Sequence, residues 1–262
     1  MQTVTSHDGT TIAYDRLGGG PSTIILVTGA MCARNTHSEL AERLAQRFTV
    51  INYDRRGRGD SGDNPQSTLR QEIEDIAALI DAAGGSACLY GISSGGALVL
   101  EAAASGLPVD KLAVYEIPYA ADEERRERGR RYVADLTAAV AAGRRGDAVD
   151  LFLGFVGLPA EAIAGMHHAP HWPGMEAIAP TLVYDAAALG LAGRGGAVPE
   201  ETIASITAPA FVLTGGATWP WLQEIQQRIA KTLPHAEFGV LDGQTHDVSN
   251  DVLAPALVTF FS

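Results

Sequence analysis

A serine between two glycines is the feature of this sequence that most directly indicates chemistry. Gly91-Ile92-Ser93-Ser94-Gly95 matches the pattern G-x-S-x-G, in which a nucleophilic serine projects from a sharp turn between a strand and a helix. Glycine at the flanking positions lets the surrounding backbone approach closely. The N-terminus of the following helix directs free N–H groups at negative charge that develops nearby. The pattern therefore predicts Ser93 as the nucleophile of an acyl transfer.

The neighbouring Ser94 is less suited to attack, because Ile92 stands where its own turn would need the first glycine. We expect the backbone N–H of Ser94 to stabilise an oxyanion instead. The alternative interpretation of the whole segment is a chance Gly/Ser turn that caps a helix, since serine is a favoured N-cap residue. A predicted strand before the segment and a predicted helix after it favour the catalytic interpretation.

The base that this serine needs is expected near the end of the chain. A serine hydroxyl is a weak nucleophile until a base removes its proton, and enzymes with this turn place the histidine last. His246 meets that order in the polar loop at residues 241–247, between the last predicted strand and the last predicted helix. A structural or surface role is the alternative for any single histidine. The other six are His7, His37, His167, His168, His171 and His235.

The carboxylate that orients the histidine is the least obvious member of the set. Most hydrolases with this serine turn carry the orienting carboxylate after the strand that corresponds here to residues 211–213. In this sequence the loop that follows, at residues 214–220, contains no Asp or Glu. Glu116 is the remaining carboxylate at the end of a predicted strand between Ser93 and His246. Carboxyl ends of parallel strands meet at one edge of a sheet, so we expect Glu116 to reach His246. An ordinary loop carboxylate is the alternative, and Asp242 and Asp247 are competitors for the role.

A second oxyanion donor is expected from the turn after the strand at residues 23–27. That turn reads Thr28-Gly29-Ala30-Met31-Cys32, and its position relative to the serine turn favours the Ala30 N–H as the donor. The Met31 N–H is the alternative. A short glycine-containing loop is also common in strand-to-helix crossovers in general.

Predicted strands and helices alternate around these residues. Four apolar runs are typical of strands covered on both faces by helices, at residues 23–27, 49–53, 87–90 and 112–116. Helical patterns separate them at residues 38–47, 73–83 and 93–104. The alternation predicts a doubly wound parallel sheet. Residues 3–6 and 11–17, joined through Asp8-Gly9, are expected to form an antiparallel hairpin before it.

The alternation is interrupted from residue 119 to residue 207. This segment is rich in helix-forming Arg, Ala and Glu, with loops that hold Pro159, Pro170, Pro173, Pro180 and Pro199. Strand and helix patterns return at residues 210–213, 219–233, 237–241 and 252–261. We therefore expect residues 1–118 and 208–262 to form one α/β core, with residues 119–207 inserted as a mainly helical cap.

Charge and composition argue against several classes of function. The net charge of −12 disfavours nucleic-acid binding, because phosphate-binding surfaces need clustered Lys and Arg. Five arginines between residues 125 and 131 alternate with acidic residues, as on a solvated helix face. No run reaches the roughly 18 apolar residues of a membrane span, and residues 1–8 lack a signal-peptide pattern. Cys32 and Cys88 alone predict no disulfide framework. We expect a cytoplasmic protein without a membrane partner.

These residues resemble the α/β-hydrolase superfamily over nearly the whole chain. Residues 54–62 are similar to the D-x-R-G-x-G-x-S segment of that family. The serine turn, Tyr115-Glu116-Ile117-Pro118 and Gly215-Gly216-Ala217-Thr218 together resemble the subgroup that contains zearalenone lactonase, in which a Glu after the sixth strand completes a Ser-Glu-His triad. The resemblance implies an α/β-hydrolase fold with Ser93, Glu116 and His246 as nucleophile, acid and base. Thr28 departs from it, because many relatives have a His there.

The expected activity is hydrolysis of a carboxylic ester or lactone through a Ser93 acyl-enzyme. No metal or organic cofactor is implied, and the expected partner is an apolar small-molecule substrate bound by a monomer or homodimer. Carbon–carbon bond hydrolysis, a cofactor-free cyclase or lyase, and a non-catalytic ligand-binding protein with the same fold are the alternatives. Ordinary core packing is the competing role for every substrate-binding candidate. The candidates are Met31, Tyr119, Trp172, Met175, Tyr184, Trp219 and Trp221.

Overall fold

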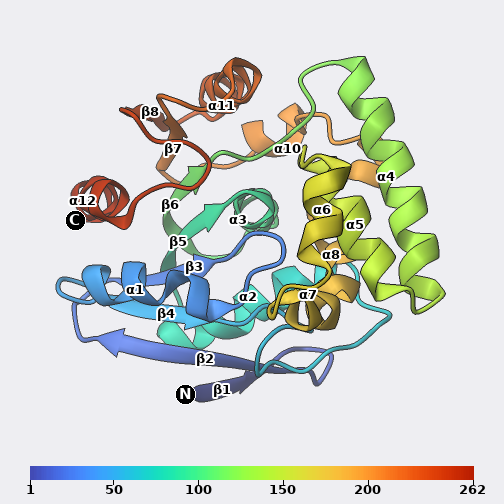
Figure 1. The fold of residues 1–262 in the computed structure, drawn as a ribbon. Coiled ribbons are helices and arrows are strands. Elements are labelled where there is room, and N and C mark those ends of the chain that lie inside the picture. Colours follow the sequence, from blue (N-terminus) through green and yellow to red (C-terminus); the bar gives the residue numbers. More distant parts are fainter.

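One eight-stranded sheet organises the protein, whose computed structural model describes residues 1–262 (Figure 1). The strand order is β1-β2-β4-β3-β5-β6-β7-β8. β2 pairs antiparallel with β1 and with β4, whereas all later pairings are parallel. The strands are β1 (Gln2–Thr5), β2 (Thr11–Gly18), β3 (Thr23–Val27), β4 (Thr49–Tyr53), β5 (Ala87–Ile92), β6 (Val109–Tyr115), β7 (Ala210–Gly215) and β8 (Ala236–Leu241). The predicted hairpin and doubly wound parallel sheet are confirmed.

Helices cover both faces of this sheet. α1 (Ser38–Leu44) and α12 (Asn250–Phe261) pack together on one face. α2 (Leu69–Ala83), α3 (Ser94–Ala104) and α11 (Pro220–Thr232) contribute to the larger core on the other face. The element order and the two helical layers are those that the alternating sequence pattern predicts.

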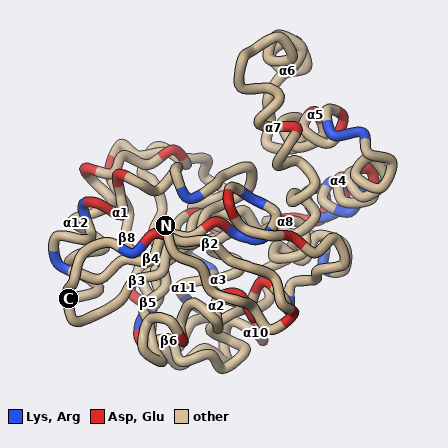
Figure 2. The backbone as a smooth tube through the Cα atoms, turned by 90° about the horizontal axis from the view of Figure 1, so that it is seen from below, with Lys and Arg blue, Asp and Glu red and all other residues tan.

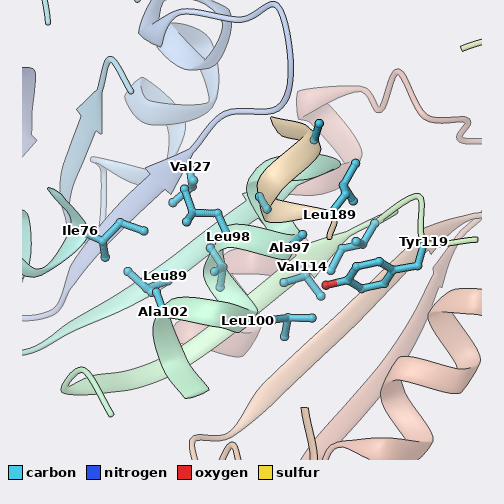
Figure 3. Close-up of a cluster of buried hydrophobic side chains, with 14 of the residues drawn as sticks. Val27, Ile76, Leu89, Ala97, Leu98, Leu100, Ala102, Val114, Tyr119 and Leu189 are labelled. Carbon is cyan, nitrogen blue, oxygen red and sulfur yellow. The ribbon is translucent and has the colours of Figure 1, made fainter. Parts of the chain in front are cut away.

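Alternate side chains of the central strands point to opposite faces, as strand geometry requires. Along β3, Ile24 and Leu26 belong to the core beneath α1 and α12, while Ile25 and Val27 belong to the core on the α3 side. Figure 3 shows Val27 beside Leu98 of α3. Burial on both faces explains why these strands are continuous apolar runs rather than alternating ones.

The parallel register brings four strand ends to one edge. Gly91 of β5 is level with Val27 of β3 and with Val114 of β6, and Val114 is level with Val212 of β7. The segments that follow these strands therefore emerge side by side. They are the turn at residues 28–32 and the segments that hold Ser93, Glu116 and residues 216–219.

A helical insertion connects β6 to β7. α4 (Glu123–Ala141), α5 (Arg145–Phe155), α6 (Ala160–Met166) and α7 (Trp172–Ile178) extend to one side of the body that carries the sheet (Figure 2). α8 (Leu182–Ala188) packs on α3, α9 (Leu191–Arg194) on α4, and α10 (Glu200–Ala204) on α3 and α11. Two short 3-10 segments, η1 (Arg34–His37) and η2 (Ala179–Thr181), complete the fold. None of the helices combines the length and apolar character that crossing a membrane would take.

Candidate active site

Ser93 lies on the turn between β5 and α3. Its φ of 57° and ψ of −131° are values that side-chain-bearing residues rarely adopt. The Ser93 N–H donates to the Tyr115 carbonyl at 2.9 Å and so ties the turn to β6. A Cβ at Gly91 would lie 2.5 Å from the Gly95 carbonyl oxygen, and one at Gly95 would lie 2.4 Å from the Val27 carbonyl oxygen. A side chain at either position would therefore clash with the backbone, so both positions of the G-x-S-x-G pattern require glycine.

Backbone strain is concentrated at this edge of the sheet. Only three residues other than glycine have a left-handed φ: Met31 at 57°, Ser93 at 57° and Glu116 at 47°. They follow β3, β5 and β6, which are adjacent in the sheet. Such conformations cost of order 1–3 kcal/mol each and persist where surrounding contacts hold them, most often at functional sites. The strain marks this edge independently of the serine motif.

Glu116 and His246 meet directly. The Nδ1 atom of His246 lies 3.0 Å from Oε2 of Glu116, whose side chain is fully buried. Glu116 Oε1 also accepts from the Gly215 N–H at 2.8 Å and from Oγ1 of Thr214 at 3.2 Å, and Oε2 accepts from Oγ1 of Thr218 at 3.2 Å. The end of β7 and the carboxylate-free segment after it thus supply donors to a carboxylate that directly follows β6.

The loop that carries His246 is held by backbone contacts to the same region. Tyr115 Oη donates to the Thr245 carbonyl at 2.5 Å, and the Ala217 N–H donates to the Gln244 carbonyl at 2.8 Å. A Cβ at Gly215 would lie 2.2 Å from the Gln244 carbonyl oxygen. No hydrogen bond joins His246 to Asp242 or Asp247, and the structure brings Glu116, rather than either aspartate, to Nδ1.

The turn after β3 approaches the serine from the other side. A Cβ at Gly29 would lie 3.1 Å from Cβ of Ser93 and 3.7 Å from its Oγ. Ala30, Ser93 and Ser94 all line one cavity. Met31 is absent from its lining and packs against the larger core.

This cavity lies between the sheet edge and the helical insertion. Its volume is about 660 Å³, and most of its lining side chains are apolar. Ser93 and His246 open into it from the sheet edge, while Phe152 and Leu189 belong to the insertion. Pockets for small molecules commonly measure 300–1,000 Å³ and combine an apolar lining with few polar groups, so the space suits a small organic ligand.

The candidate binding residues divide into two groups. Tyr119, Trp219 and Trp221 line the cavity. Met31, Trp172, Met175 and Tyr184 do not. Trp172 packs against the ring of His167, with centroids 4.3 Å apart, and the Tyr184 hydroxyl donates to Oδ1 of Asp63 at 2.8 Å. Both aromatic side chains therefore stabilise the fold rather than line the cavity. The residue type alone does not distinguish these two roles.

Two buried polar residues of the cavity were missed by reasoning from the sequence. Asp185 stands alone in an alanine-rich segment and carries no motif, yet its side chain is buried between Arg55 and Arg58. His37 lines the cavity as well, and its buried Nδ1 has no hydrogen-bond partner. Burial lowers the pKa of His37 to about 4, so its imidazole is neutral at neutral pH. No group of three or more His, Cys, Asp or Glu side chains is arranged to hold a metal ion.

Known proteins share this arrangement of elements. An alpha/beta hydrolase from Sphaerobacter thermophilus DSM 20745 is 50% identical over 100% of both chains, with a TM-score of 0.88. A thermophilic esterase from Thermogutta terrifontis is 23% identical over 99% of this chain and 97% of its own, with a TM-score of 0.70. An enol-lactonase from Burkholderia xenovorans LB400 is 18% identical over 99% of both chains, with a TM-score of 0.64. The last two likenesses show a shared fold.

A family model gives the assignment. The model described as "Alpha/beta hydrolase family" matches residues 24–256, which include the serine turn, Glu116 and His246. The eight-stranded sheet with helices on both faces is the fold that the sequence resemblance implied. From the family match and the 50% identical relative, the chain belongs to the alpha/beta hydrolase family.

Proposed function

We propose that this protein hydrolyses a small, largely apolar carboxylic ester or lactone through an acyl-enzyme on Ser93. The observation that carries the proposal is the 3.0 Å contact between His246 Nδ1 and Glu116 Oε2, on the wall of the cavity that also contains Ser93. A buried carboxylate on Nδ1 leaves Nε2 as the nitrogen that can exchange a proton with the serine.

The reaction has two halves. His246 accepts the Ser93 proton as Oγ attacks the substrate carbonyl, and the N–H groups of Ser94 and Ala30 stabilise the tetrahedral oxyanion. The leaving alcohol takes the proton from His246. A water molecule, deprotonated by the same imidazole, then attacks the acyl-enzyme. The bond from the acyl carbon to Ser93 Oγ breaks, the imidazolium returns its proton to Oγ, and the acid is released. Residues of the chain transfer every proton and stabilise every charge in this scheme, so the scheme uses no metal or organic cofactor.

Glu116 has two tasks in the scheme. Its carboxylate holds the imidazole in the tautomer that carries a proton on Nδ1, and its negative charge stabilises the imidazolium that forms during attack. The three donors from Thr214, Gly215 and Thr218 hold the carboxylate in one orientation. A Glu after the sixth strand is also what the resemblance to the zearalenone-lactonase subgroup implies, which supports lactones as substrates beside open-chain esters.

The substrate class follows from the cavity. A cavity of about 660 Å³ whose lining is mostly apolar, with Arg125 and Arg128 also in it, favours a molecule of modest size that is largely apolar. Esterase and enol-lactonase are the activities named for two proteins of the same fold, and both are acyl transfers to water.

The test combines turnover with labelling. The protein is incubated with short-chain p-nitrophenyl esters, a panel of lactones and a fluorophosphonate, and the adduct is located by mass spectrometry. We expect turnover and a single adduct on Ser93, both abolished by Ser93→Ala and both retained by Ser105→Ala at the far end of α3. A folded wild-type protein that neither turns over these substrates nor labels on Ser93 would overturn the proposal.

A further inference from the structure

A buried carboxylate from the helical insertion touches the serine turn. Asp185 lies on α8, and its Oδ1 accepts from the Ser94 hydroxyl at 2.7 Å. The same oxygen accepts from Arg55 Nη1 at 2.6 Å, and Oδ2 accepts from Arg58 Nη2 at 2.7 Å. All four side chains are buried. Asp185 therefore joins α8, the loop after β4 and the residue that follows the nucleophile.

The two arginines extend this network to the other oxyanion turn. Arg58 Nη1 donates to the Gly29 carbonyl at 2.6 Å, and Arg55 Nη1 donates to the Thr28 carbonyl at 3.1 Å. The Gly29 carbonyl and the Ala30 N–H belong to one trans peptide and so point in opposite directions. A guanidinium that fixes the Gly29 oxygen thereby fixes the direction of the Ala30 N–H and polarises it as a donor.

Charge explains why Asp185 is needed for this arrangement. Glu72 accepts two hydrogen bonds from Arg55, at 2.8 and 2.9 Å, so two arginines face two carboxylates in a buried, neutral set. Burial acts to raise the pKa of Asp185, but Arg58 and Arg55 outweigh it and hold the pKa below its ordinary value. Removing the Asp185 charge would leave Arg58 without an acidic partner, and an uncompensated buried charge rearranges its surroundings.

We propose that Asp185 is a positioning residue that aligns both oxyanion donors for the reaction of Ser93. It acts on the Ser94 N–H through the Ser94 hydroxyl, and on the Ala30 N–H through Arg58. The inference rests on the proposed function, since it assigns a partner to the oxyanion hole of that same site. Oxyanion donors act on the transition state more than on the bound substrate, so misalignment lowers kcat and leaves KM nearly unchanged.

The test replaces Asp185 with its neutral isostere. Loss of one complete oxyanion donor lowers kcat by about 10²–10³-fold, and we expect Asp185→Asn to lower it by about tenfold to a hundredfold because both donors remain but are misaligned. KM for a p-nitrophenyl ester should stay within about twofold of wild type. Affinity for a trifluoromethyl ketone, which forms a tetrahedral oxyanion on Ser93, should fall in parallel with kcat/KM.

Asp75→Asn is the matched control. Asp75 forms a two-bond ion pair with the buried Arg56, at 2.8 and 2.7 Å, and Arg56 makes no hydrogen bond to residues 28–32 or to Ser94. This variant breaks an equally buried ion pair and leaves Arg56 paired with Asp8 at 2.9 Å, so its thermal stability should fall while kcat and ketone affinity stay near wild type. A purely structural role for Asp185 predicts the same behaviour for both variants.

A second variant covers the case in which Asp185→Asn does not fold. Ser94→Ala removes one hydrogen bond to Asp185 and keeps the backbone donor, and we expect it to fold and to lower kcat by about threefold to tenfold at unchanged KM. The inference is overturned if a folded Asp185→Asn protein, or the Ser94→Ala protein in its place, keeps wild-type kcat and ketone affinity. An inert wild-type protein would instead overturn the proposed function, so the two failures are distinguishable.

Discussion

The imidazole of His246 is 38% exposed, whereas the Glu116 carboxylate 3.0 Å from its Nδ1 has no exposed surface. The pair thus extends from the cavity wall into the interior of the protein, with the imidazole on the accessible side and the carboxylate buried behind it. A carboxylate in this position is shielded from solvent that would weaken its hold on the imidazolium. The contact makes the choice of acid directly testable.

Glu116→Gln should lower kcat by about 10⁴-fold, the loss seen when the acid of a Ser-His-acid triad is replaced by its amide. The amide can stabilise the wrong imidazole tautomer and carries no charge to balance the imidazolium. Steady-state hydrolysis of a p-nitrophenyl ester measures the effect. Asp242→Asn and Asp247→Asn are the controls, because neither carboxylate bonds to His246. A larger loss of kcat in either aspartate variant than in Glu116→Gln would assign the orienting carboxylate to that aspartate.

Gly95→Ala should destabilise the protein severely. The added Cβ would lie 2.4 Å from the Val27 carbonyl oxygen and 2.5 Å from the Thr28 carbonyl oxygen, and both obstacles are backbone. Overpacking of a close-packed interior typically costs about 1–3 kcal/mol and more where backbone must move. Gly165→Ala is the control, because nothing lies within 4 Å of its added Cβ and the residue is in helix α6. Thermal unfolding should show a lower Tm for the first variant only.

Acid should destabilise the protein through His37. Burial lowers the native-state pKa of His37 to about 4, below the ordinary value of 6.5. Between those pH values the unfolded chain binds a proton at this residue that the native state excludes, so stability falls as the pH decreases from 6.5 to 4. The shift corresponds to about 3 kcal/mol. Urea unfolding at several pH values should show that His37→Phe loses less stability than wild type over this range. Parallel curves for the two proteins would contradict the prediction.

Trp219→Ala should weaken binding of aromatic substrates. Trp219 lines the cavity, is 55% exposed and stacks near Trp221 with ring centroids 6.3 Å apart. Aromatic contacts contribute about 0.5–1.5 kcal/mol beyond area burial, so KM for an aryl ester should rise by about twofold to tenfold with a smaller change in kcat. Trp172→Ala should lower stability without this change in KM, because Trp172 is buried away from the cavity lining. Equal changes in KM for both variants would show that Trp219 has no specific role in substrate binding.

Local chemistry accounts for the part of the site that the sequence predicts. A serine turn needs glycines at Gly91 and Gly95 because added side chains would meet backbone, and such a constraint leaves a readable pattern. Chain order pointed to His246, and the absence of Asp and Glu between residues 214 and 220 pointed to Glu116. The structure brings Glu116 and His246 together, while their catalytic roles and that of Ser93 stay predictions until the variants are measured.

Residues that act through distant contacts leave no such pattern. Asp185 meets Arg55, Arg58 and Ser94 across separations of 130, 127 and 91 residues. Its neighbours in sequence are alanines and a tyrosine, and none of them reveals a buried charge. Trp172 and Tyr184 show the opposite case, because aromatic side chains suited to a pocket are used for packing and hydrogen bonding elsewhere.

The sequence by itself determined the alternation of strands and helices, the glycine-flanked serine turn and the candidates for base and acid, because these depend on periodicity, glycine and chain order. Only the tertiary structure decided which side chains face the cavity and how the turns after β3 and β5 are held. Those features depend on where the insertion packs against the sheet edge, and that packing is the sum of many weak contacts between residues far apart in the chain.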